Sequence, residues 1–295
     1  MTDMEGNMNV GLRDETLRSW VLEDLGYGDV TSEALIPPTL LATAKLFYKE
    51  PGVAAGLEEA VAMFSLLGCT TTLKAKDGDS VKAGQILLTI KGSGRSVLSG
   101  ERVALNVVAH MAGIATATAE AVRSARSVNP GIRVAATRKT LPGLRYIEKR
   151  AVELGGGDSH RLGLDDMVLI KDNHIKLQPS IREAIRLARE KISFTKKIEA
   201  EARTGDEAEE AAAAGADIVL LDNMPPREID QCLRRLEARG LREGRLIEVS
   251  GGITLRNVAE YAATGVDVVS LGSLTHSSRA LDVKLEVELI EGSRA

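Results

Sequence analysis

The stretch KKIEAEARTGDEAEEAAAAGADIVLLDN, residues 196–223, contains two short strand-like runs separated by an alanine-rich segment of helical composition. Strands that alternate with helices of this length form right-handed crossover units and a parallel sheet. The same alternation begins at IRVAAT (132–137) and continues to VDVVSLGS (266–273), with at least six strand-like runs. Apolar character on both faces of such strands is typical of an α/β barrel or a doubly wound sheet.

Polar residues and glycines follow nearly every one of these strands at its carboxyl end. An α/β barrel builds its active site from those ends, so we favour the barrel over the doubly wound sheet. The residues concerned are Thr137, Arg138, Lys139, Lys171, Asp172, Asn173, His174, Asp222, Asn223, Ser250, Gly251, Gly252, Gly272 and Ser273.

The sequence before the barrel has a different texture. Helical, strand-like and turn segments are mixed there, and an alanine-rich stretch at 98–127 is unbroken by proline and predicts long helical structure. We therefore expect an N-terminal α+β domain over 1–115 and a catalytic α/β barrel over 116–277. The tail at 278–295 alternates like a strand or short helix and could pack back on either domain, and we group it with the first.

Composition limits the function classes. The 295 residues carry a formal net charge of −4, which argues against a general binder of nucleic acid or membrane surfaces. Cys69 and Cys232 lie far apart in apolar contexts and are expected to be buried, reduced thiols. The first residues lack the pattern of a secretory signal, and no apolar run approaches the roughly 18 residues of a membrane span. We expect a cytoplasmic protein.

Basic residues gather after the first barrel strand. TRKTLPGLR (137–145) sets Arg138, Lys139 and Arg145 close together, and GGGDSHR (155–161) adds His160 and Arg161. With Lys171, these cations are too many for structural pairing at one rim, so we expect several to hold a small, multiply anionic substrate. SGGITLRN (250–257) and LGSLTHSS (271–278) follow the last two strands, where backbone N–H groups of barrel enzymes bind phosphate.

An acidic pair, Glu201 and Asp222, lies at the ends of consecutive strands. Such hard oxygen ligands suit Mg²⁺, which uses one or two carboxylates together with substrate phosphate oxygens. Lys197, Glu199 and Glu201 occupy alternate positions and should point to one face of their strand. Internal salt bridges from the acidic pair to Lys171 or Lys197 are the alternative to a metal-side role.

With these residues assembled, nearly the whole chain resembles the quinolinate phosphoribosyltransferase family. Two departures stand out: Ala200 replaces the usual β-branched residue between the glutamates, and Ala112 stands where serine is common. Neither is a predicted ligand group. The resemblance rests on ordered blocks: GERVALN (100–106), GIATAT (113–118), TRKTLPGLR (137–145), GGGDSHRLGLDDMVLIKDNH (155–174), EAE (199–201), LLDN (220–223), SGGI (250–253) and SLGSLTHS (270–277).

The resemblance implies an N-terminal open-sandwich domain, an incomplete seven-stranded α/β barrel, and a homodimer with shared active sites. It implies that Arg102 contacts substrate across the dimer, and that Lys139, Glu201 and Asp222 are catalytic. Glu201 and Asp222 fall on the ribose and metal-side positions, with Mg²⁺ held directly or through the substrate pyrophosphate. The basic substrate pocket comprises Thr137, Arg138, Lys139, His160, Arg161 and Lys171, and the phosphate site comprises Ser250, Gly251, Gly252, Ser270, Leu271 and Gly272.

The implied reaction joins quinolinate to phosphoribosyl pyrophosphate, giving nicotinate mononucleotide, pyrophosphate and carbon dioxide in de novo NAD biosynthesis. The close alternative is a related transferase that uses nicotinate, or a molybdenum-associated paralogue. A carrier module is suggested by DGDSVKAGQILLTIKG (77–92), and an isomerase or aldolase with Lys171 as a Schiff-base lysine is a third alternative.

Overall fold

The computed structural model describes residues 4–290, with side chains from residue 13 onward. The chain divides into two compact units. The first comprises the chain up to Thr116 together with the segment from Arg279 onward, and the second is Ala117–Ser278. Each is described by itself below.

The first unit is built on an antiparallel sheet of four strands in the order β12-β1-β5-β3. Strand β1 alternates between buried and more exposed residues, as expected for a strand with one face on a core. Strand β5 pairs with both β1 and β3, so the stretch that suggested a carrier module is part of this sheet. The elements are α1 (Met4–Leu25), α2 (Val30–Leu35), β1 (Leu41–Tyr48), β2 (Gly52–Val53), α3 (Leu57–Leu66), β3 (Thr70–Leu73), β4 (Ser80–Val81), β5 (Ile86–Ser93) and β12 (Val283–Leu289); α4 (Gly94–Arg126) runs across the boundary into the second unit.

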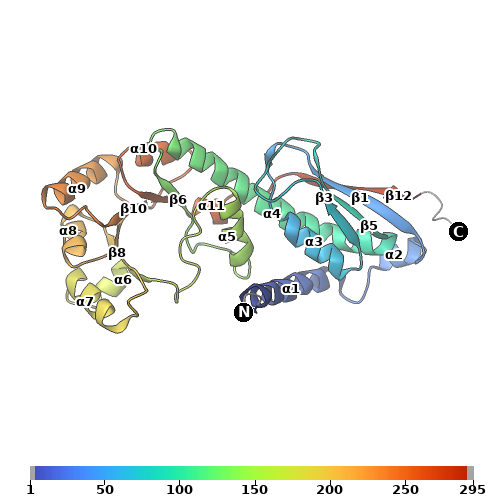
Figure 1. The fold of residues 1–295 in the computed structure, drawn as a ribbon, viewed down its shortest axis with the longest axis horizontal. Helices are drawn as coiled ribbons and strands as arrows, with labels where there is room; N and C mark the ends of the chain where they lie inside the picture. Colours follow the sequence, from blue (N-terminus) through green and yellow to red (C-terminus); the bar gives the residue numbers. More distant parts are fainter. Residues whose placement is uncertain (1–3, 291–295) are drawn as a thin grey trace. The chain divides into compact units, whose positions relative to one another are not determined.

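The second unit is a parallel sheet of six strands in the order β6-β11-β10-β9-β8-β7, with helices outside the curved sheet (Figure 1). Neighbouring strands are joined by helical connections, which is the crossover pattern predicted from residues 196–223. The elements are β6 (Arg133–Ala135), α5 (Arg145–Leu154), β7 (Val168–Ile170), α6 (Asp172–Ile175), α7 (Ile181–Lys191), β8 (Ile198–Ala202), α8 (Gly205–Ala213), β9 (Ile218–Asp222), α9 (Pro226–Ala238), β10 (Leu246–Ser250), α10 (Val258–Ala262), β11 (Val268–Ser270) and α11 (Ser273–His276).

The barrel is incomplete, as expected, and its seventh strand is reduced to one bridge. Ala135 of β6 pairs with β11 on one side and forms an isolated parallel bridge with Asp158 on the other. Asp158 follows a turn at Gly155–Gly157, where an added Cβ on Gly157 would lie 2.7 Å from Thr118 and 2.9 Å from Val152. The chain passes close to these residues at the sheet edge and brings His160 and Arg161 to the carboxyl ends of the strands.

Local sequence signals fix where the barrel helices begin. The side chain of Ser180 accepts the N–H of Glu183 at the start of α7, and that of Thr204 accepts the N–H of Glu207 at the start of α8. Both are standard N-caps. Thr204 follows β8 after one residue, whereas Ser180 follows the short helix α6.

Two further expectations concern burial. Cys69 and Cys232 are buried free thiols, which confirms their predicted state. Helix α4 is long and apolar enough to cross a membrane by length and composition, a stretch that the sequence prediction overlooked, but 61% of its most apolar window is buried within the protein. A buried core helix passes the same composition test.

Candidate active site

A cavity of about 400 Å³ opens at the carboxyl ends of the parallel strands in the second unit. Its volume lies in the range of small-molecule sites. Every strand of the sheet or the loop after it contributes to the lining, as predicted for a barrel. The lining residues are Ala136, Thr137, Arg138, Lys139, His160, Arg161, Leu169, Lys171, Glu199, Glu201, Leu220, Asp222, Asn223, Glu248, Ser250, Gly251, Gly252 and Ser270.

Four cationic side chains meet in this cavity: Arg138, Lys139, Arg161 and Lys171. Arg161 is only 8% exposed, and burial together with the nearby Arg138 charge lowers the pKa of its guanidinium. Among the described residues, the buried Nε of Arg138 has no hydrogen-bond partner. Buried donors are almost always paired in folded proteins, so an unpaired guanidinium N–H beside a second cation favours an anionic ligand.

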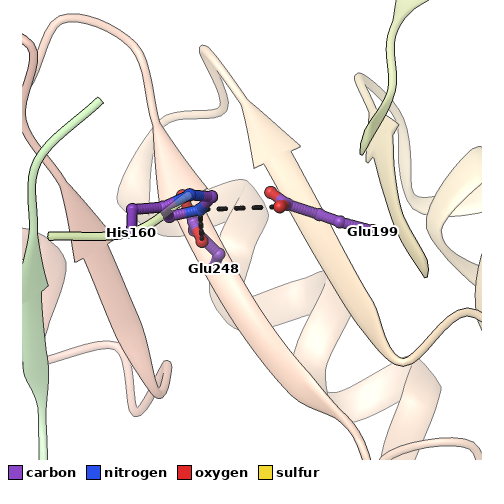
Figure 2. Close-up of side chains that lie close together, drawn as sticks. All are labelled: His160, Glu199 and Glu248. Atoms are coloured by element: carbon purple, nitrogen blue, oxygen red, sulfur yellow. Dashed lines mark hydrogen bonds and ion pairs between the residues drawn. The ribbon is translucent and has the colours of Figure 1, made fainter. Parts of the chain in front are cut away.

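His160 is held in a left-handed backbone conformation, with φ of 54°. Its N–H donates to Oδ1 of Asp158 at 2.8 Å, and the N–H of Arg161 donates to its ring Nδ1 at 2.7 Å. Because Nδ1 accepts that hydrogen bond, the ring proton lies on Nε2. Nε2 faces a carboxylate oxygen of Glu248 at 3.2 Å and one of Glu199 at 3.5 Å (Figure 2).

Glu199 on β8 and Glu248 on β10 project toward the same imidazole, that of His160 (Figure 2). Glu199 is fully buried, and neither of its carboxylate oxygens has a hydrogen-bond partner within residues 13–290. Burial raises the pKa of Glu199 to about 8, and the Glu248 charge adds to the increase. At neutral pH Glu199 therefore holds a proton, while Glu248 accepts the hydrogen bond of His160 and orients its ring.

The acidic side of the cavity is formed by Glu201 and Asp222, as predicted. Burial and the Asp222 charge raise the pKa of Glu201. Arg203 lies against both, with nitrogen–oxygen distances of 3.5 Å to Glu201 and 3.8 Å to Asp222, and it contacts Asp172 at 3.0 Å. Arg203 thus forms the ion pairs with the acidic pair that the sequence alternative gave to Lys171 or Lys197.

The loop after β10 lines the cavity with two glycines, Gly251 and Gly252, which have no side chains. Gly251 and Gly252 have φ of 96° and 65°, which residues with a side chain rarely adopt. An added Cβ on Gly251 would lie 2.9 Å from the backbone nitrogen of Asn223. Asn223 is fixed in turn, because its N–H donates to the Ser250 carbonyl at 2.8 Å and its side-chain amide donates to Asp222 at 2.8 Å.

Three predicted site residues lie outside this lining. Leu271 is fully buried and its N–H donates to the Ala135 carbonyl, so neither its side chain nor its N–H is available to a phosphate. A Cβ added to Gly272 would lie 2.9 Å from the side chain of Lys139 and 3.2 Å from that of His276. Arg102 is exposed on α4 in the first unit. Of the predicted segment Ser270 to Gly272, Ser270 is the residue that lines the described cavity.

The sequence prediction missed Glu248 and the role of Glu199, and it named Asn223 only as one of the residues at the strand ends. Glu248 sits in LIEVS, and Glu199 in IEAEA, each a glutamate inside an otherwise buried strand. Because buried carboxylates are rare unless paired, a glutamate in the middle of a predicted barrel strand is a usable signal for an interior site. Arg203, by contrast, follows its strand in a loop and carries no such signal.

Comparison with known proteins covers nearly all of the chain. Residues 29–112 match the model of the quinolinate phosphoribosyl transferase N-terminal domain, and residues 114–286 match that of the C-terminal domain. A probable nicotinate-nucleotide pyrophosphorylase [carboxylating] of Methanothermobacter thermautotrophicus is 46% identical over 92% of this chain and 98% of its own. The nicotinate-nucleotide pyrophosphorylase [carboxylating] of Homo sapiens is 39% identical over 91% and 89%. The crystal structure of NadC from Streptococcus pyogenes matches with a TM-score of 0.88 and 39% identity, covering 94% and 97%.

Proposed function

Because the chain belongs to the quinolinate phosphoribosyl transferase family, we propose that it joins quinolinate to phosphoribosyl pyrophosphate and releases pyrophosphate and carbon dioxide. The product is nicotinate mononucleotide, and the step belongs to NAD biosynthesis. One observation carries the assignment to this site: four cations and an acidic pair line a single cavity of about 400 Å³. A dicarboxylate and a pyrophosphorylated sugar together require such a distribution of charge.

We assign the quinolinate carboxylates to the side of the cavity that holds Arg138, His160 and Arg161. Guanidinium groups bind planar carboxylates through two parallel hydrogen bonds, and the unpaired Nε of Arg138 offers one such donor. The pKa of Arg161 is lowered by burial and by Arg138, so a bound anion relieves repulsion between the two guanidinium groups. Nicotinate has one carboxylate fewer and leaves part of this charge unmatched.

The chemistry needs little acid–base help from the chain. The pyridine nitrogen attacks C1 of the ribose as the bond to the pyrophosphate oxygen breaks, and the leaving electrons go to pyrophosphate. The positively charged ring then accepts the electron pair from the breaking bond to the 2-carboxylate, carbon dioxide departs, and C2 takes a proton. Charge stabilisation around the departing pyrophosphate is the largest contribution that we expect from the protein.

Glu201 and Asp222 are assigned to the ribose hydroxyls and the metal side. Burial and the Asp222 charge on the adjacent strand raise the pKa of Glu201, and a bound cation would oppose that increase. Their hard oxygen donors fit Mg²⁺, and Lys139 and Lys171 lie at the same cavity to meet the pyrophosphate. Glu201 and Asp222 would hold Mg²⁺ on this side, and the ion would supply positive charge beside the departing pyrophosphate.

The sugar 5-phosphate is assigned to the loop after β10. Ser250, Gly251 and Gly252 line the cavity there, and the positive φ of both glycines lets backbone come close to a ligand. Ser270 adds a hydroxyl from the neighbouring strand. This assignment keeps four of the six predicted phosphate-site residues and leaves out Leu271 and Gly272.

The homodimer is proposed from the family resemblance. Arg102 is exposed on α4. In a dimer, the Arg102 of a second copy could reach the cavity of about 400 Å³ and contact an anionic substrate there. A shared site predicts that two different inactive chains restore activity when they are mixed. A cytoplasmic location is proposed on the same basis.

The decisive assay measures carbon dioxide from quinolinate labelled in its 2-carboxylate. Release should require both quinolinate and phosphoribosyl pyrophosphate, and nicotinate should give no comparable turnover. Arg138→Gln should remove most of the activity, while the matched Arg182→Gln, on the exposed surface of α7, should leave it unchanged. Turnover of nicotinate at the rate of quinolinate would favour the related nicotinate transferase. Borohydride trapping of a substrate on Lys171 would instead favour the aldolase alternative.

A further inference from the structure

Helix α5 carries three charged residues that do not line the cavity but bond to the loops that do. Arg145, Glu148 and Lys149 lie on its first two turns, between the loop at 137–144 and the loop at 155–167. The first loop bears Arg138 and Lys139, and the second bears His160 and Arg161. The sequence singled out Arg145 as one more cation of the substrate group, and the proposed function does not use it.

Lys149 fixes the second loop. Its side chain is 2% exposed, and its ammonium donates to the backbone carbonyl of Ser159. Ser159 directly precedes His160, whose left-handed φ of 54° is unfavourable for a residue with a side chain. Asp158 accepts the His160 N–H from the other side, so the strained residue is clamped between an ammonium and a carboxylate. The clamp aims the imidazole at Glu248 and Arg161 into the cavity.

Glu148 and Arg145 fix the first loop and tie it to the second. Glu148 is fully buried, and its Oε2 accepts the N–H of Leu141 at 3.2 Å. Arg145 donates from Nε to the hydroxyl of Thr140 at 3.1 Å and from Nη1 to the carbonyl of Leu162 at 3.2 Å. One guanidinium therefore spans both loops.

Burying charged side chains is unfavourable unless they make specific bonds, and apolar residues of similar size are often more stabilising in such positions. Here the side chain of each of the three residues bonds to an atom of one of these loops. Cationic ligand groups must be held to within a fraction of an ångström to act together.

We propose that Arg145, Glu148 and Lys149 are positioning residues that set the spacing between the Arg138–Lys139 and His160–Arg161 groups, and thereby the affinity for the dicarboxylate substrate. The inference rests on the proposed function, because it takes quinolinate as the ligand of those groups. Lys149 bonds to the loop assigned to quinolinate, whereas the 5-phosphate is assigned to a different loop, the one after β10. Its loss should therefore affect the two substrates unequally.

The main test replaces Lys149 by methionine, which keeps the length of the side chain and removes its charge. Lys191→Met, which removes an exposed ammonium from α7, is the matched control. We expect Lys149→Met to raise KM for quinolinate by about tenfold or more and KM for phosphoribosyl pyrophosphate by less than about threefold. A residue that only stabilises the fold would lower the active fraction and leave both KM values unchanged.

A double-variant comparison tests whether Lys149 acts through its loop. In an Arg161→Lys background, where the quinolinate contact is already weakened, Lys149→Met should raise KM for quinolinate much less than in the wild type. In a Ser250→Ala background it should have its full effect. Equal effects in the two backgrounds would overturn the proposed route.

Arg145→Gln keeps the test decisive if Lys149→Met does not fold, because Arg145 is half-buried at the start of the helix. It should also raise KM for quinolinate selectively, by about fivefold. Unchanged KM values in Arg145→Gln and in any folded Lys149 variant, with an active wild type, would overturn the positioning role alone. A wild type that releases no carbon dioxide from quinolinate would overturn the proposed function as well.

Discussion

Substituting Gly251 by alanine separates two physical costs at the proposed phosphate loop. Gly251 has φ of 96°, and an added Cβ would lie 2.9 Å from the backbone nitrogen of Asn223 and closer still to its side-chain amide oxygen. Gly215, between α8 and β9, has a similar φ of 90°, but an added Cβ there meets nothing within 4 Å. Gly215→Ala thus measures backbone strain alone, and Gly251→Ala measures strain plus displacement of Asn223.

The magnitudes follow from these contacts. An alanine in a left-handed conformation costs about 1–2 kcal/mol relative to glycine, which is the whole effect expected for Gly215→Ala. Displacing Asn223 strains its hydrogen bonds to the Ser250 carbonyl and to Asp222, each worth about 1 kcal/mol. Gly251→Ala should therefore be less stable than Gly215→Ala by about 1–2 kcal/mol, or roughly 2–5 °C in melting temperature.

The functional assay is steady-state turnover with each substrate varied in turn. Gly251→Ala should raise KM for phosphoribosyl pyrophosphate by about tenfold, because the added methyl and the shifted Asn223 crowd the loop assigned to the 5-phosphate. Gly215→Ala should leave both KM values unchanged. If the two variants have the same melting temperature, the reasoning about the Asn223 contact is wrong. If Gly251→Ala alters KM for quinolinate alone, the phosphate assignment is wrong.

Three further outcomes are expected. Burial and the Glu248 charge raise the pKa of Glu199 to about 8, so the neutral form of Glu199 is favoured in the folded state. The free energy of unfolding of the wild type should therefore fall as pH rises from about 5 to 8, by at most about 1.4 kcal/mol per pH unit. Glu199→Gln should flatten that slope in melting curves. Parallel slopes would refute this. Chelation of divalent cations should stop turnover, and added Mg²⁺ should restore it. Glu201→Gln and Asp222→Asn should need more Mg²⁺ for half-maximal rate. Turnover that survives chelation would count against a metal requirement. Arg102→Ala mixed with Lys171→Ala should regain part of the activity, and no gain in isolated heterodimers would remove the shared-site proposal.

The alternation of strands and helices after residue 132 was enough to predict the parallel sheet, because crossover connections admit few topologies. The strand-end rule predicts that Arg138, Lys139, Lys171, Glu201 and Asp222 meet at one edge of the sheet, and all five line the cavity. Both inferences depend only on periodicity and chain order, which a single sequence displays.

Other parts of the site could not be predicted in this way. The tautomer of His160 depends on the N–H of the next residue folding back onto its ring, which follows from a positive φ that no neighbouring residue type demands. The occupation of the Leu271 N–H depends on pairing with Ala135, which is distant in sequence. The pKa of Glu199 depends on how deeply the barrel buries it beside Glu248. These are properties of tertiary packing.

Strand β12 has a consequence for how the chain is made. It pairs with β1 along its length, from Ala42 opposite Leu289 to Tyr48 opposite Val283. A ribosome releases β1 long before β12, so until β12 is made one edge of β1 has no neighbour from its own chain. Such open edges invite association between nascent chains. Fragments that stop before Val283 should therefore aggregate through the open edge of β1, even when their barrel is folded.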